Sequence, residues 1–101
     1  MKRQAIAINV TLANFTEQGI KNIKESPQRA QAFRDLAKKH GVTVRDLYWT
    51  IGQYDLVTIT EGSDEALAAL LLSVARLGNV RTHTLRAMDL ETMKRVLDKV
   101  G

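Results

Sequence analysis

The chain contains no cysteine, one proline and one tryptophan, and its other aromatic residues are two tyrosines and two phenylalanines. Without cysteine, disulfides, thiolate metal sites and cysteine nucleophiles are excluded, and a reducing cytoplasm is permitted. No apolar run is long enough to cross a bilayer. The first residues, Met1 to Gln4, lead into a short alternating segment and not into the apolar core of a secretory signal. We therefore expect a cytoplasmic protein that does not contact a membrane.

The composition is that of an ordinary globular domain. With 45% hydrophobic residues in 101 positions, the chain can bury a core as one domain over residues 1–101. The net charge is +4, but the basic residues are dispersed and acids lie between them. A nucleic-acid footprint should gather positive charge on one face, so we interpret the charge as a solvated basic surface and expect no nucleic-acid partner.

Apolar residues follow two periods along the chain. Four segments alternate with the period of a strand, and three carry apolar residues at steps of three and four, which is typical of helices. Ser26 and Asp89 are expected helix caps, with Pro27 at the first helical position of the longer helix. The predicted strands cover 5–13, 42–51, 54–60 and 80–88, and the predicted helices follow Ser26, Ser63 and Asp89, with a short helical turn over 18–23.

This order, β-α-β-β-α-β with an additional C-terminal helix, predicts a ferredoxin-like α+β fold with a four-stranded antiparallel sheet backed by helices. Gly52-Gln53 suits a type II′ hairpin, which would pair Trp49 with Leu56 and Tyr48 with Val57. Both faces of the sheet would then carry large apolar or aromatic groups. We expect helices to cover one face and a second subunit to cover the other.

Several short segments together resemble the GYD-domain family, over essentially the whole chain. The segments are Gly19-Ile20 with Asn22, Tyr48-Trp49-Thr50, Gly52-Gln53-Tyr54-Asp55, and Gly78-Asn79-Val80-Arg81-Thr82 followed by Leu85-Arg86-Ala87. The glycine, tyrosine and aspartate that name the family would be Gly52, Tyr54 and Asp55. The resemblance implies a dimeric α/β barrel of two ferredoxin-like subunits whose sheets pack face to face. It implies no particular reaction, because related barrels include monooxygenases, haem enzymes and ligand-sensing modules.

Tyr54 and Asp55 are the first candidate site residues. The phenol could donate a hydrogen bond to a substrate oxygen while the carboxylate orients the substrate or acts as a base. In the structural alternative, which we favour for Asp55, the carboxylate accepts hydrogen bonds from turn amides and Tyr54 packs beside Ile51. Trp49 could form an aromatic wall for a planar ligand, and packing at a dimer interface is the equal alternative.

His83 and Arg86 are the candidates on the fourth predicted strand. His83 could shuttle a proton or ligate haem, but no second histidine or carboxylate stands at metal-ligand spacing nearby, so a surface or interface histidine is the preferred interpretation. Arg86, like Arg81, could bind an anionic ligand or form an interface salt bridge. Nucleophile-elbow, phosphate-loop, dinucleotide and zinc motifs are absent from the sequence, and we expect no cofactor and no metal.

These observations favour a homodimeric small-molecule binding or sensing module. The ligand would be small and partly apolar or aromatic, contacted by Trp49, Tyr54 and Arg86, and held between sheet and helix or at the dimer seam. One alternative is a cofactor-independent oxygenase- or isomerase-like enzyme in which Asp55 or His83 moves a proton. Another is a structural assembly protein without a ligand. Association of dimers into a higher assembly is left open.

Overall fold

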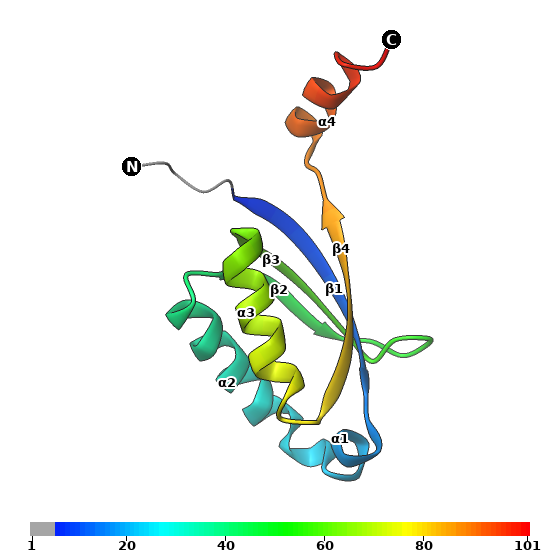
Figure 1. Ribbon diagram of the computed structural model, residues 1–101. Coiled ribbons are helices and arrows are strands. Elements are labelled where there is room, and N and C mark those ends of the chain that lie inside the picture. Colours follow the sequence, from blue (N-terminus) through cyan, green and yellow to red (C-terminus); the bar gives the residue numbers. More distant parts are fainter. Residues whose placement is uncertain (1–5) are drawn as a thin grey trace.

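The computed structural model describes residues 6–101. It contains a four-stranded antiparallel sheet with helices, which confirms the predicted α+β class (Figure 1). Ala5, the first residue of the first predicted strand, lies outside the described residues. The elements in order are β1 Ala7–Phe15, α1 Glu17–Lys21, the 3-10 turn η1 Ile23–Glu25, α2 Ser26–Lys39, β2 Thr43–Trp49, β3 Leu56–Gly62, α3 Asp64–Ala75, β4 Val80–Ala87 and α4 Leu90–Leu97.

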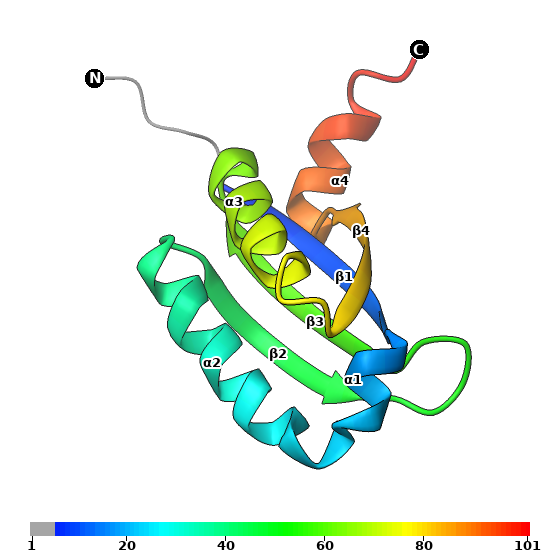
Figure 2. The ribbon, with the colours of Figure 1, turned by 60° about the horizontal axis from the view of Figure 1, so that its bottom comes forward.

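The strands lie in the order β2-β3-β1-β4, and each neighbouring pair is antiparallel. Figure 1 shows α2 and α3 on one side of the sheet, with α4 beyond the end of β4. In the turned view, α2 runs alongside β2 (Figure 2). Apart from Thr92, every residue of α4 is exposed. No helix within the described residues is long and apolar enough to cross a membrane.

The helices begin largely as their sequence signals predict. Ser63 accepts a hydrogen bond from the Ala66 amide, and Asp89 accepts one from the Thr92 amide, so both act as N-caps. The prediction that Ser26 caps α2 is wrong. Ser26 is the first residue of the helix, and the N-cap position before it makes no side-chain hydrogen bond. Its hydroxyl is therefore available for another contact.

The two faces of the sheet differ in an unexpected way. Along β1, the side chains of Asn9, Thr11 and Ala13 are buried, and the residues between them are only half-buried. The buried, largely polar side is the one that α2 and α3 cover, because Thr11 and Ala13 line a cavity together with residues of both helices. The opposite side, here called the open face, carries most of the large aliphatic residues of the sheet. Its members on β1, β3 and β4 include Ile8, Val10, Leu12, Val57, Ile59 and Leu85.

A small core lies between the helices and the sheet. Ala37, Val42, Leu67 and Leu70 are its buried members, and Phe33 is among the half-buried residues packed against them. Leu67 and Leu70 come from the apolar stripe of α3, and Ala37 comes from that of α2.

The hairpin between β2 and β3 is longer than predicted. Its register is confirmed, because Trp49 pairs with Leu56 and Tyr48 with Val57. The prediction of a two-residue turn at Gly52-Gln53 is wrong, since neither strand includes residues 50–55 and the loop protrudes from the sheet (Figure 1). The Thr50 hydroxyl donates to the Tyr54 carbonyl at 2.7 Å, and this side-chain contact closes a wider loop.

Candidate ligand-binding site

A cavity of about 300 Å³, open to solvent, lies between the helix-covered face of the sheet and helices α2 and α3. It lies at the first of the two places expected for a ligand, between sheet and helix. All four strands and both helices contribute to its lining. Examples are Thr11, Leu47, Leu56, Thr82, Phe33 and Val74.

The walls of the cavity are mainly apolar. Both phenylalanines of the chain, Phe15 and Phe33, line it. Phe15 lies at the end of β1, two residues beyond the buried Ala13 and hence on the same side of the strand. Phe33 belongs to the apolar stripe of α2, and Leu71 and Val74 come from the facing stripe of α3. Such walls favour an apolar or aromatic ligand body.

A strand irregularity helps to form one wall. The ladder between β2 and β3 shifts at Arg45, so that Leu47 pairs with Thr58. Both of these residues line the cavity. Without the shift, Leu47 would point away from Val44 in a regular strand, since neighbours at odd spacing lie on opposite faces. The irregularity therefore places an apolar side chain of the edge strand over the cavity.

Ser26 is a buried polar group of the cavity wall, with only 5% of its surface exposed. Its hydroxyl accepts a hydrogen bond of 2.9 Å from the indole nitrogen of Trp49. Trp49 itself does not line the cavity and is 48% exposed. Trp49 thus reaches the cavity wall only through Ser26, and its contact with a ligand stays a prediction.

Arg29 is the only charged side chain among the described residues that line the cavity. Its guanidinium donates from Nη1 to the Asn22 carbonyl at 2.9 Å and from Nη2 to the Gly19 carbonyl at 3.2 Å. Both acceptors belong to the segment that joins β1 to α2. Arg29 therefore anchors this segment against α2 at one end of the cavity.

The same segment packs closely on the connection between α3 and β4. A Cβ on Gly19 would lie 2.0 Å from the carbonyl oxygen of Asn79, so no other residue fits there without displacing backbone. Asn79 lines the cavity, and its carbonyl accepts a hydrogen bond from the Thr16 amide at 3.0 Å. Gly78 has a φ of +81°, which permits the chain to leave α3 in this direction. Gly19 and Gly78 thus shape the end of the cavity.

Tyr54 and His83 lie together but away from the cavity. Their ring centroids are 5.9 Å apart with an edge-on angle of 66°. His83 pairs with Leu12 on β1, which places it on the open face of the sheet. The structure therefore separates Tyr54 and His83 from Trp49, whose indole contacts α2 on the helix-covered side.

Asp55 binds to the end of β1. Its Oδ2 atom accepts a hydrogen bond of 2.9 Å from the Phe15 amide, and its own amide donates to the Ala13 carbonyl at 2.9 Å. The carboxylate does not line the cavity. Its observed contacts are those of a structural residue, with the amide partner supplied by β1 and not by the turn.

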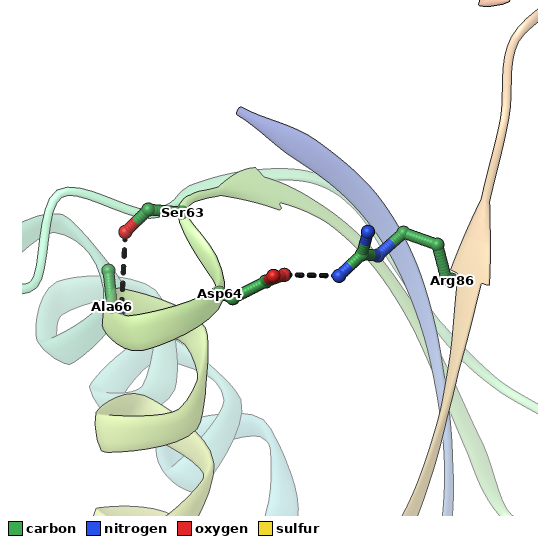
Figure 3. A network of polar contacts seen from close by, with 4 residues as sticks. All are labelled: Ser63, Asp64, Ala66 and Arg86. Atoms are coloured by element: carbon green, nitrogen blue, oxygen red, sulfur yellow. Dashed lines mark hydrogen bonds and ion pairs between the residues drawn. The ribbon is translucent and has the colours of Figure 1, made fainter. Parts of the chain in front are cut away.

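Arg86 pairs with Asp64, the first residue of α3 (Figure 3). This exposed ion pair joins β4 to the start of the helix that Ser63 caps. Arg86 is absent from the cavity lining. No group of three potential metal-ligating side chains occurs within residues 6–101.

The sequence interpretation missed Ser26, Arg29 and Asn79. The sequence predicts a cap role for Ser26, and Arg29 is one of its dispersed basic residues. A signal was present, because Ser26, Arg29 and Phe33 recur at spacings of three and four residues and so share one face of α2.

The chain thus has an α+β fold, with a cavity on the helix-covered face of its sheet. The family model for the GYD domain matches residues 10–97, and the chain belongs to the GYD-domain family. No curated protein and no solved structure gave a significant match.

Proposed function

We propose that the protein is a small-molecule binding module whose ligand occupies the cavity between the sheet and helices α2 and α3. The observation that carries the proposal is an open apolar cavity of about 300 Å³ with a few polar groups, Ser26, Arg29 and Asn79, at its wall. Cavities of this kind, apolar with sparse polar groups that fix orientation, are typical of sites for small ligands.

The enzymatic alternative has less support. Asp55 uses its carboxylate to accept the Phe15 amide, and His83 contacts Tyr54 on the opposite side of the sheet from the cavity. Neither group reaches the space in which a substrate would be enclosed. We therefore propose binding without bond cleavage. We also propose a cytoplasmic location, with which the absence of cysteine is compatible.

Binding can be tested with octan-1-ol, octanamide, octanoate and 2-phenylethanol as probes. Trp49, the only tryptophan, contacts the cavity wall through Ser26, so its fluorescence should report occupancy. We expect saturable binding of one or more probes to the unmodified protein and a rise in its melting temperature. Absence of saturable binding by every probe would overturn the proposal.

A cavity-filling pair of variants locates the binding. Ala30 lines the cavity, and Ala30→Phe should occupy it and abolish probe binding. Ala68 is exposed on α3 and does not line the cavity, so Ala68→Phe should bind the probes normally. Equal binding by the two variants would place the ligand elsewhere.

We also propose that two copies associate through their open faces as a dimeric α/β barrel of ferredoxin-like subunits. The strand order β2-β3-β1-β4 supports the ferredoxin-like topology. The aliphatic side chains of the open face support the association, since Val10 and Ile59 are neighbours there and Leu85 is 55% exposed. A second copy would remove this apolar surface from water.

The association can be tested by Leu85→Glu on the open face. Leu72→Glu is the matched control, because Leu72 is 69% exposed on α3 and lies on the helical side. We expect the unmodified protein and the control to sediment at twice the chain mass of 11.3 kDa, and Leu85→Glu to sediment as a monomer. A monomeric unmodified protein would contradict the proposal.

A further inference from the structure

Three of the polar residues that line the cavity lie at one end, whereas its threonines lie along the strands. Arg29 donates to the Gly19 carbonyl, and Gly19 packs directly on the backbone of Asn79, so both cavity residues meet around this glycine. Ser26 precedes Arg29 by three positions in α2 and therefore lies one turn away on the same helix face. Ser26, Arg29 and Asn79 form what we call the polar end of the cavity.

The polar end has hydrogen-bond donors to spare. The Ser26 oxygen accepts from Trp49, which leaves its own O–H free to donate. Asn79 uses its side-chain oxygen to accept from Gln18 at 2.9 Å, and no hydrogen bond within the described residues uses its Nδ2. The guanidinium of Arg29 carries more N–H donors than its two carbonyl contacts employ. These donors match a ligand group that only accepts.

The charge of the polar end is positive and is not neutralised by a carboxylate. Within residues 6–101, no aspartate or glutamate lines the cavity, and no ion pair includes Arg29. A planar guanidinium favours a carboxylate, which it can bind through two parallel hydrogen bonds. Arg29 is half-buried, so such a pair is screened less than one on the surface.

The remaining cavity restricts the rest of the ligand. Its walls away from the polar end are mainly aliphatic and aromatic, with Phe33, Leu36 and Val74 among them, and the hydroxyl of Thr11 on the sheet already pairs with that of Thr84 at 3.0 Å. A volume of about 300 Å³ holds roughly ten groups of the size of a water molecule. A ligand that satisfies both regions has one anionic group and a compact apolar body.

We propose that the ligand class is an apolar monocarboxylate, with its carboxylate held at the polar end by Arg29, Ser26 and Asn79 and its apolar body against Phe33. This inference rests on the proposed function, since it assigns the ligand of the same cavity. It goes further because it names the charge of the ligand, the residues that recognise the carboxylate and the end of the cavity at which the carboxylate lies.

The test compares octanoate with octanamide, which differ in charge and share the same tail. We expect the unmodified protein to bind octanoate about tenfold more tightly, or more, because a hydrogen bond to a charged group is stronger than a neutral one. Arg29→Gln should lower the affinity for octanoate by roughly tenfold to a hundredfold and the affinity for octanamide by less, so that the preference disappears. Titration calorimetry and Trp49 fluorescence measure both affinities.

Two further variants serve as controls. Arg34→Gln makes the same change in charge on the same helix, but Arg34 is exposed and does not line the cavity, so the preference for octanoate should persist. Arg29→Lys retains the positive charge and should retain part of the preference. It also preserves the comparison if Arg29→Gln fails to fold.

The outcomes separate this inference from the proposed function. Equal affinities for octanoate and octanamide, or equal effects of Arg29→Gln and Arg34→Gln, would overturn the carboxylate assignment while the cavity still binds small molecules. If no probe binds to the unmodified protein, the proposed function fails and the ligand class fails with it. A preference that disappears only in Arg29→Gln supports both.

Discussion

The indole nitrogen of Trp49 lies 2.9 Å from the hydroxyl oxygen of Ser26, to which it donates a hydrogen bond. This contact joins the last residue of β2 to the first residue of α2. Ser26→Ala should lower the free energy of unfolding by about 1 kcal/mol and shift the emission of the single tryptophan. Denaturant unfolding followed by fluorescence measures both effects.

The matched control for that change is Ser73→Ala on α3. The Ser73 hydroxyl donates to the Ala69 carbonyl within the same helix at 2.8 Å and has no contact with Trp49. Its removal should leave the tryptophan emission unchanged. An identical emission spectrum for Ser26→Ala would contradict the contact.

Asp55 supplies a second prediction. Asp55→Ala removes the acceptor of the Phe15 amide and should lower the free energy of unfolding by about 1–3 kcal/mol. Asp55→Asn retains a side-chain oxygen and should lose less. Hydrogen exchange at the Phe15 amide should accelerate in Asp55→Ala, and unchanged protection would mean that the carboxylate does not hold β1.

The glycines predict a contrast between crowding and backbone strain. Gly19→Ala would place Cβ 2.0 Å from the Asn79 oxygen and should lower the free energy of unfolding by roughly 2–3 kcal/mol. Gly41 has open space around it and a φ of +74°, so Gly41→Ala should cost only about 1 kcal/mol of conformational strain. Thermal and chemical unfolding of the two variants measure the difference. A larger loss for Gly41→Ala would be inconsistent with the contact at Gly19.

Asp89 gives a prediction for pH. Hydrogen bonds from the Thr92 side chain and backbone amide hold the pKa of the Asp89 carboxyl below its ordinary value of 3.8. Since the folded pKa is the lower one, its contribution to stability is present above pH 3.8 and is lost as the pH falls through the folded pKa. Circular dichroism should show α4 losing helicity in acid. Asp89→Asn, which keeps a cap but does not titrate, should remove this part of the acid transition.

The sequence predicted the strand pairing better than the identity of the site. Period-two alternation places Trp49 and Tyr48 on opposite faces, and the observed pairs with Leu56 and Val57 agree. The turn length was missed because it depends on the Thr50 hydroxyl, whose partner is a backbone carbonyl four residues away. Strand alternation does not encode such a side-chain contact.

The cavity residues were harder to predict for a different physical reason. A strand pattern separates two faces but does not state which one the helices cover. In β1 the helices lie over Thr11 and Ala13, and the more apolar side, with Val10 and Leu12, is the open face. The alternation therefore does not mark Thr11 as a residue of a cavity wall. The helical spacing of Ser26 and Arg29 was the better guide.

The alternation in β1 determines which surface a substitution in this strand affects. Odd-numbered positions such as Thr11 and Ala13 line the cavity, and the even-numbered Val10 and Leu12 belong to the open face. Two neighbouring codons thus specify residues on opposite surfaces of one strand, one at the cavity and the other on the open face. With the proposed ligand and the proposed dimer, substitutions at the odd-numbered positions would change ligand preference and leave the dimer contact intact, and substitutions at the even-numbered positions would do the reverse.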